Sequence, residues 1–484
     1  MFLCPDKTGQ LDQDGIRMTQ PFYRDAAEQF RTPLYRSAAA GPLVRERRFG
    51  VILLCALPFI DTIIAQLHNG LHLSAGDFSL PQVVHGGLLL VAWLYIINAG
   101  RKNVLTRRVY PSAFIILLFF TAVSVRSIAN AGAFNFSAIV MPLQVVYWCT
   151  MWILTTQICT THRISWKVLN AYAFASLITA MSVFWGYMSG LNTAVYGIRA
   201  SSGLFSSGKG IAGMLAAAAF IFAYLSMKVG RKTYLLFAAL CTAAAYLTYA
   251  RAGLVAMGIA AVWASAWAVI RTGPSKWIRR FVVLLAVSIV GVILVVGVKD
   301  MEHRWQDLNE GDKAGSGRIL LWTLAWNFFT NGSPSQQLFG IGIDGMLNMT
   351  YASKAHIAIH THSDLFDLIT IGGFAGILTL LTIPASIVAL GRLLHSGIAE
   401  YGLFWCIAWI MAGQGLLTGQ FFLPEAMTIY LVTMTAAAVH GATLFAPDAQ
   451  RGFLRPRHPR VSFPEVRRQP VKGRLTGPEP QYLG

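Results

Sequence analysis

The chain is divided into apolar segments about 20 residues long, the length that an α-helix needs to cross the hydrocarbon core of a bilayer. Stretches such as LLLVAWLYII and FVVLLAVSIVGVILVVG are apolar without interruption, whereas the strands of outer-membrane barrels alternate polar and apolar side chains. In lipid each backbone amide must find a hydrogen-bond partner within its own segment, so uninterrupted apolar runs predict helices. The predicted fold class is therefore an all-α polytopic membrane protein.

Twelve of these segments are long enough to be transmembrane helices. Their predicted bounds are 50–67, 81–99, 110–128, 138–158, 168–189, 209–227, 233–249, 253–270, 281–298, 365–391, 402–423 and 425–445. The composition agrees, because 55% of the 484 residues are hydrophobic and only 12% are charged. Such a composition excludes a soluble globular protein and an intrinsically disordered one.

The charges give these helices an orientation. Lys and Arg number 39 against 21 Asp and Glu, a net charge of +18, and most basic residues fall on the side that both termini share. By the positive-inside rule that side is the cytoplasm. We expect a cytoplasmic tail at 1–49, a transmembrane domain at 50–445 and a basic, Pro-rich cytoplasmic tail at 446–484. The excess charge therefore describes orientation and does not indicate nucleic-acid binding.

One outer loop, residues 299–363, is much longer than the others and joins the ninth and tenth predicted helices. Loops of this length in compact proteins usually carry function. Within it the segment RILLWTLAWNFFTN begins at Arg318 and ends at an Asn-Gly turn. This pattern predicts a short helix that lies at the membrane interface.

Basic residues of the outer segments stand out in two further places. Arg199 and Lys209 flank the Gly- and Ser-rich stretch that leads into the sixth helix. Backbone N–H groups at a helix N-terminus with two nearby cations suit a phosphate, although an ordinary flexible loop fits the same residues. Arg251 lies in a tight turn between two apolar helices, where a guanidinium either has a function or extends to the interface.

A histidine cluster closes the long loop. His356, His360 and His362 precede Asp364 and Asp367, just where the chain re-enters the membrane. Imidazole accepts a proton near neutral pH, which suits a general base. Two other interpretations stay open: a metal site made by His360, His362 and Asp364, and solvent-facing histidines with Asp364 as a helix cap.

The order of these motifs resembles the O-antigen ligase and polysaccharide polymerase superfamily. The segments that carry the resemblance are GLFSSGKGIAG, YARAG, SGRILLW, LFGIGIDG and HTHSDLFDLITIGGFAG, within residues 195–425. The chain departs from the family pattern at Ser363, where an Asn often follows the His, at Ile371, where a Glu is expected, and at 208–210, where GKG replaces an Asn.

The resemblance implies a glycosyltransferase of the C type, with a multi-helix body and an active site at the outer face of the bacterial inner membrane. The donor would be a glycan on undecaprenyl diphosphate and the acceptor a sugar hydroxyl, with no metal and no other cofactor. His362, or His360 in its place, would be the general base. The cations that would bind the diphosphate are Arg199, Lys209, Arg251 and Arg318.

The leading hypothesis is a polymerase of exopolysaccharide or O-antigen repeat units. The close alternative is an O-antigen ligase of lipopolysaccharide biosynthesis, which joins the glycan to lipid A core. A hypothesis of another class is a flippase or transporter of the lipid-linked oligosaccharide, but transporters place ionisable residues near the midplane, and the candidates here collect outside. Expected partners are the lipid-linked glycan, its sugar acceptor, membrane lipids and other polysaccharide-assembly proteins.

Overall fold

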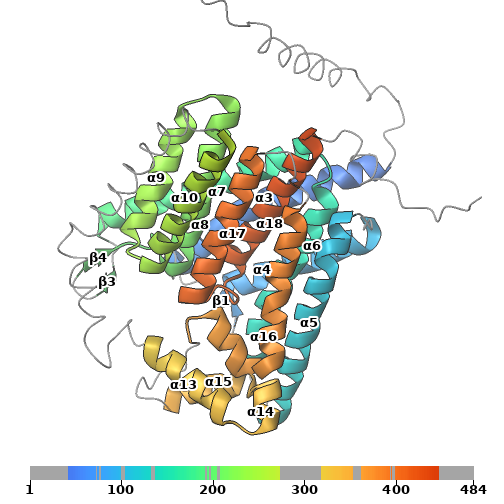
Figure 1. Cartoon of the computed structure of the whole chain (residues 1–484), viewed down its shortest axis with the longest axis vertical. Coiled ribbons are helices and arrows are strands. Elements are labelled where there is room, and N and C mark those ends of the chain that lie inside the picture. The colour runs from blue at the N-terminus through green and yellow to red at the C-terminus, as the bar shows by residue number, and fades with distance from the viewer. Residues whose placement is uncertain are drawn as a thin grey trace, which may run out of the picture. The chain divides into compact units, whose positions relative to one another are not determined.

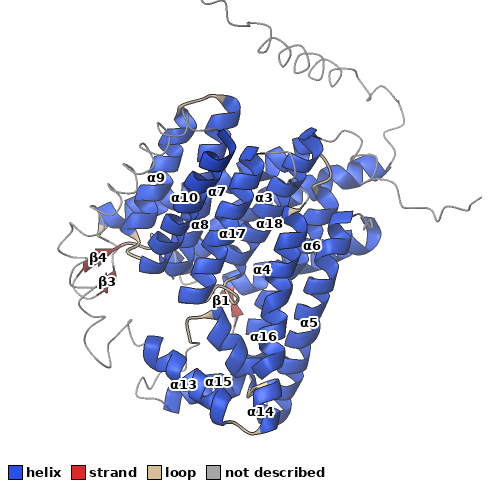
Figure 2. Ribbon diagram, in the orientation of Figure 1, coloured by secondary structure: helices blue, strands red, loops and turns tan. Residues whose placement is uncertain are grey.

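The chain folds into long helices, as a computed structural model shows (Figures 1 and 2). The structure describes residues 42–71, 74–75, 78–99, 104–131, 137–190, 193–195, 198–203, 208–272, 318–352, 361–392, 394 and 398–445. It divides into two compact units, residues 1–50 and 51–484, and the account below concerns the second.

Eleven of the predicted transmembrane segments correspond to helices. They are α3 (Pro42–Leu71), α4 (Leu80–Ala99), α5 (Val104–Ala131), α6 (Ser137–Ile158), α7 (His162–Ser189), α8 (Gly208–Val229), α9 (Thr233–Leu247), α10 (Arg251–Thr272), α16 (Asp364–Gly391), α17 (Ile398–Thr418) and α18 (Pro424–Phe445). In the described part of the chain, eight helices are long and apolar enough to cross a membrane, and α9 and α10 are shorter apolar helices. The protein is an all-α polytopic membrane protein, as predicted. The predicted segment 281–298 and the tail 446–484 lie outside the described residues.

Two short hairpins, which the sequence pattern did not predict, lie in loops between the helices. Strands β1 (Ser74–Ala75) and β2 (Phe78–Ser79) pair antiparallel before α4. Strands β3 (Thr193–Val195) and β4 (Ile198–Ala200) pair antiparallel between α7 and α8. Runs of two or three residues are too short for the alternation of side chains to be recognised in a sequence.

Small residues let the central helices approach closely. A Cβ atom placed on Gly253 of α10 would lie 2.5 Å from the Cβ of Ala212 in α8, and one on Gly413 of α17 would lie 3.0 Å from the Cβ of Ala256. Because lipid tails are as apolar as side chains, helices in a bilayer associate through such close packing. The result is a tight contact among α8, α10 and α17, whose ends position the candidate site.

A buried ion pair joins the last turn of α8 to the first turn of α17. Glu400, 1% exposed, lies 2.6 Å from Lys228 Nζ, and its Oε1 accepts a hydrogen bond of 2.9 Å from the Tyr224 hydroxyl. A buried carboxylate is tolerated when its charge and lone pairs are satisfied in this way.

The described part of the long loop 299–363 contains three helices: α13 (Arg318–Asn331), α14 (Pro334–Phe339) and α15 (Gly342–Ala352). Helix α13 has the predicted bounds. Helices α14 and α15 were not predicted, because each is short and α14 depends on a capping box, in which Ser333 and Gln336 exchange hydrogen bonds. All three lie at one end of α16 (Figure 1).

The junction between α14 and α15 fits against a kink in α16. Gly373 has φ 57° and ψ −138° inside α16, and a Cβ atom there would lie 2.3 Å from the Gln337 carbonyl oxygen. A Cβ atom on Gly340, which has φ 65°, would lie equally close to the Ile371 carbonyl carbon. The Ile341 amide donates to the Thr370 carbonyl over 2.9 Å. The glycines of the LFGIGIDG and ITIGGFAG segments are therefore one packing unit.

Gly373→Ala is expected to destabilise the fold, because the side chain meets backbone atoms and the φ angle is positive. Strained backbone of this kind costs on the order of 1–3 kcal/mol. Thermal denaturation of the purified protein, followed by size-exclusion fluorescence, should show a lower midpoint. Gly87→Ala is the control, since nothing lies within 4 Å of a Cβ atom there. Equal midpoints for the two variants would contradict the packing described.

Candidate functional site

The SGRILLW segment places two functional side chains on one face of α13. Arg318 and Trp322 are four residues apart, the spacing at which helical side chains lie side by side. Arg318 Nη1 donates to the Leu417 carbonyl near the end of α17 over 2.5 Å. Trp322 Nε1 donates to the Thr361 carbonyl over 3.1 Å, and its ring stacks on Phe366 of α16 with centroids 5.5 Å apart. Helix α13 thus joins the end of α17 to the start of α16.

His362 lies in this junction, in a backbone conformation that few residues adopt. Its φ is 61°, a left-handed value that costs a non-glycine residue about 1–2 kcal/mol. The residues on either side are fixed: the Thr361 amide donates to Asp367 Oδ1 over 2.6 Å, and the Thr361 hydroxyl donates to the same oxygen over 2.7 Å. The Ser363 carbonyl accepts from the Asp367 amide over 2.8 Å. A half-buried imidazole held at a strained position is typical of a functional residue.

The charges of two arginines, Arg251 and Arg318, act on each other. Arg251 is the first residue of α10, directly after a turn in which Tyr249 has φ 50°. Burial lowers the pKa of Arg318, and the positive charge of Arg251 lowers it further, so the two cations interact. Both are half-buried. Two cations that share a partly desolvated position are stabilised by an anion between them.

Arg199 lies near the same end of the bundle by its backbone position. It belongs to β4, opposite Ala194, and Ser201 follows directly after that strand. The Ser201 amide donates to the Leu247 carbonyl at the end of α9 over 3.0 Å, and its hydroxyl donates to the Val183 carbonyl over 2.9 Å. The β3–β4 hairpin is therefore attached beside the turn that precedes α10.

The structure describes only some of the remaining predicted site residues. Lys209 lies in the first turn of α8. His356 and His360 fall in 353–360, outside the described residues, so the choice between His360 and His362 as base remains a prediction.

The two aspartates hold backbone groups of neighbouring segments. Asp364 is not the N-cap of α16, which is Ser363; its Oδ1 accepts from the Gln420 and Phe421 amides over 2.7 and 2.8 Å. Within the described residues, no three His, Cys, Asp or Glu side chains are grouped as metal ligands. Asp364 and Asp367 are positioning residues for the loop at His362 and for the turn between α17 and α18.

Sequence reasoning missed a set of buried polar residues behind this turn. The Gln420 side-chain amide donates to the Thr418 hydroxyl over 2.9 Å, and that hydroxyl lies 2.8 Å from Gln414 Oε1. All three residues are buried. It also missed four ionisable residues of α3, α4, α6 and α18: Asp61 contacts His85 and Tyr147, and Glu425 lines the same pocket as those two rings. A usable signal was present, because ionisable residues inside apolar segments mark functional positions in membrane proteins.

Comparison with known families supports the resemblance in the sequence. Residues 236–381, less than a third of the chain, match a family model described as O-antigen ligase, so this region is similar to that family. The match includes Arg251, Arg318 and His362, whereas Arg199 and Lys209 precede it. A search of curated proteins finds no match.

His362→Gly should separate the strain of the backbone from the chemistry of the imidazole. Glycine adopts a φ near 61° without steric cost, so the thermal midpoint should stay the same or rise. Any activity that needs the imidazole should be lost in the same preparation. A midpoint well below that of the unmodified protein would show that His362 is a structural residue.

Trp322→Phe should weaken the link between α13 and the histidine loop. The variant keeps the ring that stacks on Phe366 but loses the Nε1 donor to the Thr361 carbonyl, a change of about 1 kcal/mol. Hydrogen exchange by mass spectrometry should show faster exchange of the peptide that contains residues 361–367. Trp326→Phe on the same helix, half exposed, is the matched control and should leave this peptide unchanged.

Proposed function

We propose that this chain, with its O-antigen ligase region at residues 236–381, is a glycosyltransferase that moves a glycan from undecaprenyl diphosphate to a sugar hydroxyl. One observation carries the proposal: helix α13 bonds to the end of α17 through Arg318 and to Thr361, beside the strained His362, through Trp322, and the charge of Arg251 acts on the same Arg318. An anion-binding pair beside a base is the combination that transfer from a lipid diphosphate requires.

In the proposed reaction the acceptor oxygen forms a bond to the anomeric carbon, and the bond from that carbon to the diphosphate oxygen breaks. The bonding electrons leave with the diphosphate, whose negative charge grows as the bond lengthens. Preorganised cations that meet charge where it develops lower the barrier, and removal of one such group costs about 10²–10³-fold in rate. Arg251 and Arg318 have this role, and the planar guanidinium suits it because it binds two phosphate oxygens at once.

His362 takes the proton of the acceptor hydroxyl. A positioned general base contributes about 10²–10⁴-fold. The left-handed backbone at this residue gives the imidazole one direction, and the hydrogen bonds of Asp367 to Thr361 maintain it. His360 is the alternative base. Arg199 and Lys209 are proposed to bind the more distant phosphate.

The reaction is assigned to the outer face of the bacterial inner membrane. The positive-inside distribution places both termini in the cytoplasm and the segment with α13, α14 and α15 outside. The proposed product is an exopolysaccharide or O-antigen chain built by a polymerase. The alternative, an O-antigen ligase with lipid A core as acceptor, uses the same residues, and the family description names a ligase.

The two alternatives predict different phenotypes for a deletion of the gene. A missing polymerase leaves single lipid-linked repeats without chains. A missing ligase leaves full-length chains on the lipid that do not reach lipid A core. A flippase of the same lipid is the third candidate, and it would relocate the substrate across the bilayer without releasing undecaprenyl diphosphate.

The test is transfer by purified protein in liposomes with lipid-linked glycan, scored by the release of undecaprenyl diphosphate. Arg318→Lys and Arg251→Lys should each lower the rate about 100-fold, because a point charge does not replace the planar fork. His362→Ala should lower it by a similar factor.

Arg126→Lys is the matched control. This half-buried arginine also donates to a backbone carbonyl, that of Phe339, over 2.7 Å, but it lies on α5 away from the histidine loop. Its rate should stay within about threefold of the unmodified protein, the cost of one exposed hydrogen bond. Undiminished release in the Arg318 and His362 variants would refute the proposed function.

A further inference from the structure

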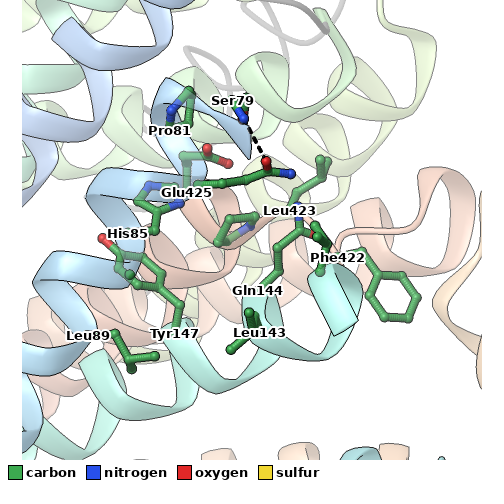
Figure 3. Close-up of a pocket in the computed structure, with 14 residues that line it drawn as sticks. Ser79, Pro81, His85, Leu89, Leu143, Gln144, Tyr147, Phe422, Leu423 and Glu425 are labelled. Atoms are coloured by element: carbon green, nitrogen blue, oxygen red, sulfur yellow. Dashed lines mark hydrogen bonds between the residues drawn. The ribbon is translucent and has the colours of Figure 1, made fainter. Parts of the chain in front are cut away.

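A second polar region lies at the periphery of the bundle and is not used by the reaction described above. It is a pocket of about 290 Å³ lined by the first turns of α4, the N-terminal half of α6 and the start of α18 (Figure 3). Its polar lining includes Ser79, Gln82, His85, Gln144, Tyr147 and Glu425. Five of these six belong to apolar helices, where polar side chains are costly unless they have a function.

A buried carboxylate fixes one wall of the pocket. Asp61 of α3 is 8% exposed; its Oδ1 lies 3.2 Å from His85 Nε2 and accepts the Tyr147 hydroxyl over the same distance. The His85 and Tyr147 rings stack with centroids 4.3 Å apart. Figure 3 shows the two side chains next to each other. Held in this way, the two rings form a rigid surface beside the polar groups of the pocket.

The rest of the lining offers hydrogen-bonding groups. Glu425 provides a carboxylate, and Gln82 and Gln144 provide amides; Gln82 Oε1 accepts from the Ser79 amide over 2.8 Å, which leaves its NH₂ group directed elsewhere. None of the described residues that line the pocket is Lys or Arg, and His85 is already paired with the Asp61 carboxylate. A phosphate therefore meets no uncompensated positive charge here, whereas vicinal hydroxyls are well matched by a carboxylate and amides that both donate and accept.

The pocket reaches the outer surface of the bundle. Leu143 lines it and is 45% exposed, and Gly86 is another exposed lining residue. Only 11% of the apolar segment of α4 is buried within the protein. A ligand can therefore keep an alkyl chain in lipid while its head enters the pocket, which is the geometry of an amphiphile.

One turn joins this pocket to the candidate site. Asp364, two residues after His362, accepts the Gln420 and Phe421 amides, and the next residues, Phe422 and Leu423, line the pocket. Arg318 contacts the end of α17 three residues before this turn, at the Leu417 carbonyl, whereas the pocket is lined from α4, α6 and α18.

We propose that this pocket binds a sugar ring of the lipid-borne acceptor and so presents the acceptor to His362 from the side opposite the donor diphosphate. The identification of the ligand as the acceptor rests on the proposed function. The preference for an uncharged, hydroxyl-rich head group follows from the pocket alone. The His85 ring, backed by the buried Tyr147 ring, offers a flat surface for the C–H face of the sugar, and Glu425 and Gln144 receive its hydroxyls.

The chain offers a matched pair of variants for the test. A Cβ atom on Gly86 or on Gly87 meets nothing within 4 Å, both glycines are exposed on α4, and only Gly86 lines the pocket. Gly86→Trp should fill the pocket without displacing other atoms, and Gly87→Trp should direct the same side chain away from it. A second pair is Gln144→Ala in the pocket and Gln157→Ala at the other end of α6.

Binding is measured with three photoreactive octyl probes that carry a diazirine next to the head: a β-glucoside, a phosphate and an amine. The full-length protein in phospholipid nanodiscs is irradiated, and the labelled peptides are identified by mass spectrometry. The glucoside should label the α4, α6 and α18 peptides saturably, and Gly86→Trp and Gln144→Ala should each lower this labelling about fivefold or more, the effect of one or two lost hydrogen bonds. Gly87→Trp and Gln157→Ala should not change it.

Equal labelling by the phosphate or the amine, labelling that does not saturate, or labelling unchanged in Gly86→Trp would overturn the pocket assignment. In the transfer assay, Gly86→Trp should raise the acceptor KM about fivefold with the donor KM unchanged, and a raised donor KM would overturn the acceptor assignment. The labelling result is independent of the transfer result. Pocket labelling with undiminished transfer in the Arg318 and His362 variants would refute the proposed function alone.

Discussion

The carboxylate of Asp364 is the interaction on which the arrangement of the site depends. It lies at the first residue of α16, yet it accepts two amides of the turn between α17 and α18. Gly415 makes this possible, because a Cβ atom there would lie 2.4 Å from Asp364 Oδ2. A carboxylate that accepts two backbone amides in a buried position makes strong, charge-assisted hydrogen bonds. These two hydrogen bonds fix the position of the His362 loop against the end of α17.

From the hydrogen bonds of Asp364, contacts extend in two directions. Toward α13, Arg318 binds the Leu417 carbonyl and Trp322 binds the Thr361 carbonyl, so a single helix face holds both the end of α17 and the histidine loop. Toward α18, the turn continues into residues that line the pocket of Asp61, His85 and Tyr147. The proposed donor and acceptor regions are thus on opposite sides of one short segment.

The sequence was sufficient for the helices and for part of the site. Uninterrupted apolar runs identified eleven of the described helices, because membrane insertion imposes length and apolarity on each segment separately. The segment RILLWTLAWNFFTN, which begins at Arg318 and ends at an Asn-Gly turn, identified α13. Arg251, Arg318 and His362 were singled out as well; the structure joins α13 to the histidine loop, and the charge of Arg251 acts on Arg318.

Other features could not be read from the sequence, for physical reasons. The role of Asp364 was missed, because its partners are backbone amides 56 and 57 residues away, and any residue type supplies an amide. The kink at Gly373 was missed, because the sequence ITIGGFAG is compatible with a straight helix until α14 packs on it. The pocket was missed, because Asp61, His85 and Tyr147 belong to three different helices and each alone is one polar residue in an apolar run.

The most direct test of the central claim is a cryo-EM structure of the protein in nanodiscs with undecaprenyl diphosphate bound. The account predicts that phosphate oxygens lie within hydrogen-bond distance of the guanidinium groups of both Arg251 and Arg318, with the His362 imidazole facing the position of the departing sugar. A diphosphate bound in the pocket at Glu425, or at any place that touches neither arginine, would contradict it.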